Sequence, residues 1–181
     1  MKSWENFIKD EKEYDLSHLA NKFFVFSRED GKKIKVYFSF SHHCFTAEHL
    51  AEGGDEWAYP HASDERYFCE TRYNLSKSLP DHMVNLLTSN PYFCRTLLKH
   101  REQFFYIEDE FHGETYRIFI EVSCPTSGYA DVRIDIRSAY HEEEYARPVT
   151  GDKWFRLWRV IDAKLSGISL PKNKPRGRGR R

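Results

Sequence analysis

Two adjacent histidines follow a strongly predicted strand. The segment 39–46, with the sequence SFSHHCFT, places His42 and His43 among serine and threonine hydroxyls. Histidine exchanges protons near neutral pH, so the pair is a candidate for acid–base catalysis; the alternative is two ordinary surface histidines. A zinc site formed with Cys44 is disfavoured, because adjacent strand residues point to opposite faces and no fourth ligand stands at a suitable spacing.

A second cluster interleaves arginines with tyrosines between residues 65 and 77. Arg66 and Arg72 alternate here with Tyr67 and Tyr73, in a region otherwise rich in acids. Guanidinium groups bind phosphate oxygens and aromatic rings stack on unpaired bases, so the pattern favours binding of single-stranded RNA. The alternative is that both arginines pair with neighbouring carboxylates.

A third cluster follows the last predicted strand, at residues 137–141. Arg137 can stabilise a pentavalent phosphate, Ser138 and Tyr140 can donate hydrogen bonds, and His141 can exchange protons. The alternative is a capped strand end. The five candidate catalytic residues are therefore His42, His43, Arg72, Arg137 and Tyr140. Their chemistry requires that distant strand ends deliver these side chains to one shared hollow.

Strands with period-two alternation must position these side chains. An Asp30-Gly31 turn between two aromatic and β-branched runs predicts a hairpin. Three later runs alternate in the same way and predict an antiparallel meander. The predicted strands span 23–26, 34–40, 104–107, 116–122 and 132–136.

Helical patterns surround these strands. We expect short helices in 3–21, a helix over 78–90 that starts at Ser78 and Pro80, and a second short helix over 92–98. A last helix carries Trp154, Leu157, Trp158, Ile161 and Leu165 on one face; Thr150 or Asp152 caps its start and Gly167 ends it. Residues 46–77 lack periodicity and predict a long loop, which at this length is a functional candidate.

The fold class that follows is α+β, with one antiparallel sheet of about five strands and flanking helices. We expect one domain over residues 1–168 and a disordered basic tail over 169–181. The chain has 28 basic and 28 acidic residues, and six of the basic ones lie in the last ten residues without an acid. The remainder has 22 basic against 28 acidic residues, which excludes a uniformly basic nucleic-acid binder. Arg176, Arg178 and Arg180 of the tail remain candidate RNA contacts.

The composition also indicates the cellular compartment of the protein and whether it needs a metal or a cofactor. The four cysteines are scattered without a zinc spacing, and the start of the chain lacks the pattern of a signal peptide. Apolar runs are too short to span a bilayer. We therefore expect a cytoplasmic protein with free thiols, no metal, no cofactor and no membrane association. The motifs of P-loop, dinucleotide-binding, HExxH and GxSxG enzymes are absent from the sequence.

A helical segment followed by a twisted meander that ends in Arg137-Ser138-Ala139-Tyr140 resembles the barnase–EndoU–colicin–RelE-like group of small ribonucleases. The resemblance covers residues 78–141. It implies metal-independent RNA cleavage, by attack of the 2′-hydroxyl on the neighbouring phosphate, in a phage or toxin-like system.

Two functions therefore stand as hypotheses. The first is a non-enzymatic interaction protein of a phage or mobile element, whose acidic body binds a basic protein partner. The alternative is a toxin-like, metal-independent endoribonuclease. The enzyme is favoured if His42 or His43 lies within hydrogen-bonding distance of Arg137 or Tyr140 in one concave pocket. The binder is favoured if these residues lie on separate faces.

Overall fold

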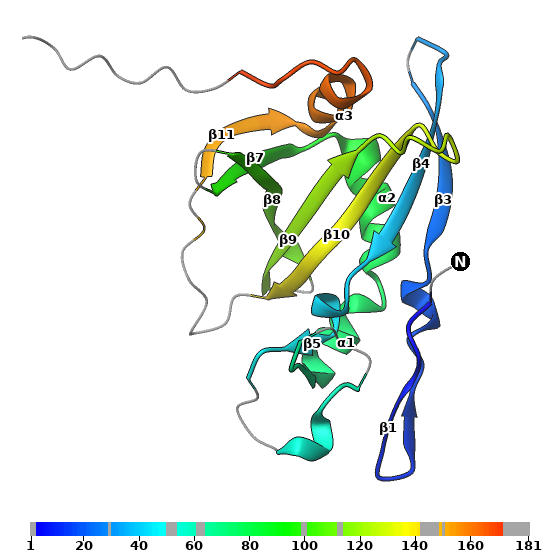
Figure 1. Cartoon of the computed structure of the whole chain (residues 1–181), viewed down its shortest axis with the longest axis vertical. Helices are drawn as coiled ribbons and strands as arrows, with labels where there is room; N and C mark the ends of the chain where they lie inside the picture. Colours follow the sequence, from blue (N-terminus) through cyan, green and yellow to red (C-terminus); the bar gives the residue numbers. More distant parts are fainter. Residues whose placement is uncertain are drawn as a thin grey trace, which may run out of the picture.

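The computed structural model describes residues 3–28, 30–49, 54–60, 64–98, 101–111, 114–141, 149 and 151–171. Its main feature is a seven-stranded sheet in the order β11-β7-β8-β9-β10-β4-β3 (Figure 1). The expected α+β class is confirmed, with a larger sheet than the predicted five strands. The strands are β3 (Lys22–Ser27), β4 (Lys33–Phe40), β7 (Tyr92–Leu98), β8 (Arg101–Phe111), β9 (Glu114–Ser123), β10 (Val132–His141) and β11 (Gly151–Arg156).

One pair in this sheet is parallel. The predicted hairpin β3–β4 and the meander β8–β9–β10 are antiparallel, as expected. Strand β10 then pairs with β4 in the same direction, with Ile136 opposite Phe40. The chain that leaves β4 therefore passes beside β10, and the main-chain N–H of Ser41 donates to the carbonyl oxygen of Ile136 at 2.9 Å.

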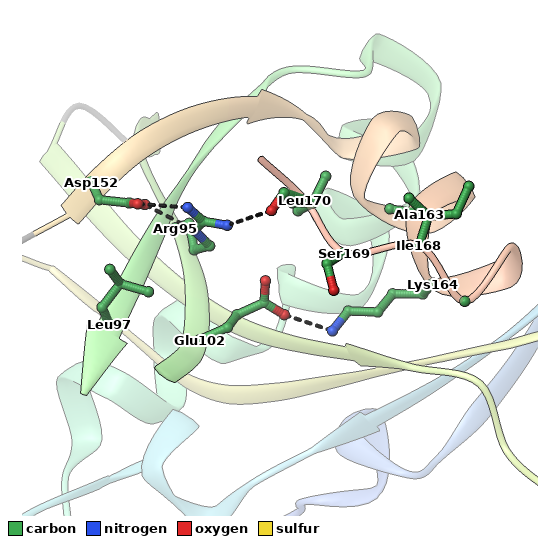
Figure 2. Close-up of a pocket in the computed structure, with 10 residues that line it drawn as sticks. Arg95, Leu97, Glu102, Asp152, Ala163, Lys164, Ile168, Ser169 and Leu170 are labelled. Atoms are coloured by element: carbon green, nitrogen blue, oxygen red, sulfur yellow. Dashed lines mark hydrogen bonds and ion pairs between the residues drawn. The ribbon is translucent and has the colours of Figure 1, made fainter. Parts of the chain in front are cut away.

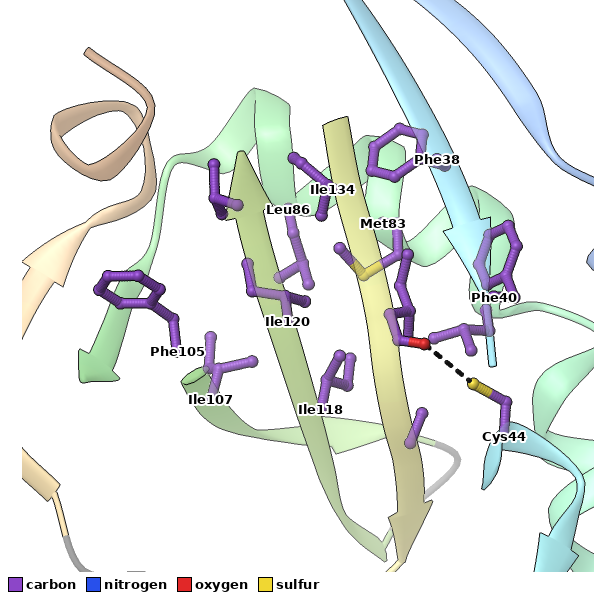
Figure 3. Close-up of a cluster of buried hydrophobic side chains, with 14 of the residues drawn as sticks. Phe38, Phe40, Cys44, Met83, Leu86, Phe105, Ile107, Ile118, Ile120 and Ile134 are labelled. Atoms are coloured by element: carbon purple, nitrogen blue, oxygen red, sulfur yellow. Dashed lines mark hydrogen bonds between the residues drawn. The ribbon is translucent and has the colours of Figure 1, made fainter. Parts of the chain in front are cut away.

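The core lies between one face of the sheet and helix α2 (Leu79–Ser89). Alternate residues of β4, β9 and β10 point to this face, as period two requires, and meet Met83 and Leu86 of the helix (Figure 3). Phe38, Ile120 and Ile134 are fully buried there. Helix α2 begins after Ser78 with Pro80 in its first turn, as predicted, although the Ser78 side chain makes no capping bond.

The expected helix over 92–98 is wrong, because this segment is strand β7. Its apolar pairs imitate helical spacing, but pairing with β8 on one side and β11 on the other decides its structure. The last helix, α3 (Leu157–Leu165), starts later than predicted, since Trp154 and Asp152 belong to β11. Asp152 is therefore not the helix cap, and Thr150 lies outside the described residues. Gly167 ends the helix in the left-handed region, at φ 63°, as expected.

The segments predicted as N-terminal helices and as a long loop fold together into a small second layer. Its elements are β1 (Phe7–Lys9), β2 (Lys12–Tyr14), η1 (Ser17–Leu19), β5 (Thr46–Ala47), η3 (Asp55–Trp57), β6 (Tyr67–Phe68) and α1 (Glu70–Ser76), with η2 (His42–Cys44) leading into it. Figure 1 shows β1, β5 and α1 beyond one end of the large sheet. The ring of Phe7 stacks on that of Phe68, with centroids 4.4 Å apart. Contacts between aromatic rings therefore hold this layer together. Its strands and helices are too short to show a regular hydrophobic period in the sequence.

The cysteines and the described helices bear on two of the sequence expectations. All four cysteines are free thiols. None of the described helices is long and apolar enough to cross a membrane.

Candidate functional site

A pocket of about 310 Å³ lies where β4 ends beside β10. It brings together three of the five predicted catalytic residues, His42, His43 and Arg137. The parallel pairing explains this convergence, since η2 follows β4 directly and therefore lies next to the same stretch of β10. Five further polar residues, none of them a candidate catalytic residue from the sequence, also line the pocket: Asn21, Ser39, Ser41, Arg133 and Asp135.

The two histidines lie on a 3-10 turn rather than on a strand. Ser41 caps this turn, with its hydroxyl oxygen accepting from the His43 main-chain N–H at 3.3 Å. The imidazole rings are neighbours, with centroids 4.3 Å apart and planes inclined by 35°. The expectation that His42 and His43 point to opposite faces is therefore wrong, because successive residues of such a turn do not alternate as strand residues do.

An acid from the predicted loop completes the histidine side of the pocket. The Nε2 atom of His42 lies 2.9 Å from a carboxylate oxygen of Asp64, while Trp4 packs edge-on against the same imidazole with centroids 5.6 Å apart. Burial alone would raise the pKa of Asp64. The hydrogen bond with His42 and the neighbouring cations outweigh that effect and hold this pKa below its usual value. The segment 46–77, singled out for its length, thus supplies Asp64, but no local pattern identified it.

His43 is uncharged at neutral pH. Burial, together with the charges of Arg66 and His42, lowers the pKa of His43 to about 4. Within the described part of the chain, the imidazole ring of His43 contacts the His42 ring and accepts no hydrogen bond. Its nitrogen lone pair is consequently available to a proton or to a metal ion at neutral pH.

The opposite wall of the pocket carries positive charge. Arg133 donates from Nε and Nη2 to one oxygen of Asp135, at 2.8 and 2.7 Å, and the Ser39 hydroxyl donates to the same carboxylate. Arg137 is less constrained, with half of its side chain exposed and its Nε 4.0 Å from Glu121. Of the two guanidinium groups, that of Arg137 has the looser ion pair, so it can contribute to binding an anion at this wall.

Arg72 and Tyr140, also predicted as catalytic, do not line this pocket. The Arg72 guanidinium is buried, donates to the Thr46 carbonyl oxygen at 2.8 Å and lies over the Tyr140 ring. Tyr140 also stacks against Phe119 on the neighbouring strand, with centroids 5.9 Å apart. Both side chains join the second layer to the sheet, beside the pocket rather than in it.

Two of the predicted RNA contacts of the 65–77 cluster lie inside the fold, and Tyr67 is half-buried. Arg66 is buried and donates to the carbonyl oxygen of Thr46 at 3.2 Å. Tyr73 is 8% exposed, and the Tyr67 hydroxyl donates to Glu65 at 3.1 Å. The tail residues Arg176, Arg178 and Arg180 lie outside the described residues.

A larger hollow of about 610 Å³ lies on another part of the molecule, between β7, β8 and the segment after α3 (Figure 2). Its charges are paired with each other. Arg95 binds Asp152, with Nε and Nη2 at 2.9 and 2.6 Å, and also donates to the Leu170 carbonyl oxygen, while Lys164 binds Glu102 at 2.6 Å. These bonds fasten the segment after α3 to the sheet, so the hollow is a structural junction.

Fold and pocket together define a single-domain α+β protein with a polar pocket, lined by histidine and arginine side chains, beside a parallel strand pair. The chain belongs to the YjaZ family, whose family model matches residues 6–165. No curated protein and no solved structure matches it significantly. Nothing in these comparisons links the chain to the barnase–EndoU–colicin–RelE-like ribonucleases.

Proposed function

We propose that this chain is an endoribonuclease that cleaves single-stranded RNA without a metal ion, in the pocket between η2 and β10. One observation carries the proposal: His43 and Arg137, far apart in the sequence, line the same hollow of about 310 Å³. An uncharged imidazole on one wall and guanidinium groups on the other are the groups that 2′-hydroxyl attack on a phosphodiester requires.

The phosphate is held by the cationic wall. Arg137 lines the pocket with half of its side chain exposed, while the fork of Arg133 is already oriented by Asp135. Guanidinium groups stabilise the extra negative charge that builds on the phosphoryl oxygens as the fifth bond to phosphorus forms.

The His43 imidazole accepts the proton of the attacking 2′-hydroxyl. The bond from the 2′-oxygen to phosphorus forms as the bond from phosphorus to the 5′-oxygen breaks, and the 5′-oxygen takes a proton from water. The products carry a 2′,3′-cyclic phosphate and a 5′-hydroxyl. His42 and Asp64 position His43 through ring packing and stay outside the proton transfer.

The test is incubation of the purified chain with a single-stranded RNA in EDTA, followed by identification of the ends produced. We expect cyclic phosphate ends, and no cleavage where a single 2′-deoxy nucleotide replaces the reacting one. His43→Gln and Arg137→Gln should each lower the rate by about 100-fold. His49→Gln, at an exposed histidine outside the pocket, is the matched control. Wild-type protein that leaves RNA intact contradicts the proposal.

A second candidate, a protein-binding function, is favoured by edge strand β3. Phe23 and Val25 of this strand are 42% and 62% exposed, and an edge strand offers unpaired main-chain groups to another chain. The acidic body suits a basic partner. A photo-crosslinking residue in place of Val25 tests this candidate: attachment to a basic protein supports it, and attachment only to a second copy of this chain opposes it.

A further inference from the structure

His42, His43 and Asp64 form a group of metal-ligating atoms at one corner of the pocket. One potential ligand atom from each residue lies within 4.8 Å of the other two. Two imidazole nitrogens and one carboxylate oxygen are ligands that zinc accepts, at bonds of about 2.1 Å. The chemistry and the spacing are thus those of a three-ligand metal site.

Small movements suffice to close the group around an ion. His42 and Asp64 already lie 2.9 Å apart, which is near the separation of about 3.4 Å between ligands at tetrahedral zinc. Asp64 has 49% of its side chain exposed and can adjust, whereas the His42 ring is fixed by Trp4. We therefore expect the exposed side chain of Asp64 to move when an ion binds, while the His42 ring keeps its position.

The surroundings of the group also suit a metal. Zinc sites that keep an open position hold three protein ligands together with water or another small ligand. Arg133 and Arg137 line the same pocket as the two histidines and favour an anion beside such an ion.

We propose that His42, His43 and Asp64 bind a late first-row divalent ion of the zinc or cobalt type, and that the bound ion inhibits the cleavage proposed above. The inhibition rests on the proposed function, because a nitrogen of His43 bound to metal cannot also accept a proton. The metal site itself rests only on the ligand group. Buried Cys44 is not part of the ligand group, and its thiol donates to the Ile136 carbonyl oxygen instead.

The metal site is tested by titrating the metal-free chain with Co²⁺ and recording its visible absorption, whose intensity reports tetrahedral coordination. We expect one equivalent to bind, and Zn²⁺ to displace it. Asp64→Ala, at a largely exposed position, should weaken binding by about tenfold or more, and His43→Gln should do likewise. Glu65→Gln, at the adjacent acid that accepts from Tyr67, is the control and should leave the titration unchanged. Absence of binding, or equal binding by wild type and both variants, overturns the site.

The inhibition is tested separately, with RNA cleavage measured in EDTA and in rising Zn²⁺. We expect cleavage to fall as one equivalent of Zn²⁺ binds, and the fall to move to about tenfold higher Zn²⁺ in Asp64→Ala. A Co²⁺ spectrum with cleavage that is unaffected or increased by Zn²⁺ overturns the inhibition and leaves the metal site standing. A Co²⁺ spectrum without cleavage in EDTA removes the proposed function, and the inhibition with it, while the metal site again stands.

Discussion

The central carbon of the Arg72 guanidinium lies 4.7 Å from the centroid of the Tyr140 ring. The same guanidinium donates to the Thr46 carbonyl oxygen at 2.8 Å. Arg72 belongs to α1 and Tyr140 to β10, so this contact joins the second layer to the large sheet. The two residues were predicted to be catalytic, but the structure gives them the role of holding the pocket in place.

We predict that Arg72→Met lowers the free energy of unfolding by about 2 kcal/mol, because it removes a buried charge-assisted hydrogen bond and the cation–π contact. Urea denaturation measures the change. Lys77→Met is the matched control, since Lys77 also lies over a tyrosine ring, at 4.4 Å from the Tyr73 centroid, but is exposed. Its effect should stay within about 0.5 kcal/mol. Equal effects of the two substitutions would contradict the assigned role of Arg72.

A second prediction concerns the close approach of β11 to β7. A Cβ atom added at Gly151 would lie 2.0 Å from the Cys94 sulfur and 3.2 Å from the Arg95 carbonyl oxygen. Gly151→Ala should therefore destabilise the fold by about 1–3 kcal/mol through overcrowding. The double variant Gly151→Ala with Cys94→Ala should recover part of this loss, since the sulfur is gone. Additive effects of the two substitutions, measured by thermal unfolding, would show that the crowding is not at this sulfur.

The pair formed by Arg95 and Asp152 predicts a dependence of stability on pH. The hydrogen bond from Arg95 holds the pKa of Asp152 below its usual value, so the folded state binds this proton less readily than the unfolded state does. The stability it contributes is present above the unfolded pKa of about 3.9 and is lost as pH falls through the folded value. Asp152→Asn should cost about 3 kcal/mol at neutral pH and progressively less in acid. Urea unfolding at several pH values measures this difference.

The control for this pH series is Glu48→Gln, at an exposed acid. Its effect on the free energy of unfolding should be small at neutral pH and change little with acidification. An Asp152→Asn cost that stays constant from neutral pH to about pH 3 would show that Arg95 does not hold the carboxylate in its ionised form.

The basic C-terminal sequence predicts a salt-dependent share of RNA affinity. Removal of residues 172–181 takes away six cations. The plot of log binding constant against log salt for a single-stranded RNA should become shallower by about 0.7 for each phosphate that the tail neutralises. The rate of cleavage at saturating RNA should stay the same, because the pocket is intact. An unchanged salt slope would exclude the tail from RNA binding.

Much of the sheet could be predicted from sequence. Alternation of Ile34, Val36 and Phe38 with polar residues identified β4, and the same pattern identified β9 and β10. Strands β7 and β11 were not predicted, because neither shows a clear alternation of apolar and polar residues and both are determined by pairing with neighbouring strands. The direction of β4 beside β10 could not be predicted either, because alternation specifies which face a residue occupies and not which strand lies next to it.

Only part of the candidate site could be predicted, because the sequence pattern does not show which segments become neighbours in the fold. His42, His43 and Arg137 were found by residue type and by their place at strand ends, and the structure brings them together. Asp64 was missed because it reaches the pocket through a segment that folds back on aromatic contacts without any sequence period. Arg72 has the right chemistry for catalysis but is directed into the interior by the fold.

The parallel pairing of β4 with β10 also determines when the pocket can exist. The histidines leave the ribosome early in synthesis, whereas Arg133 and Arg137 follow only after helices α1 and α2 and strands β7, β8 and β9 have been made. A nascent chain, or a fragment ending before β10, therefore carries the imidazoles without the guanidinium wall. Under the proposed function, a growing polypeptide would therefore lack a complete site for cleaving RNA until β10 has been made and has paired with β4.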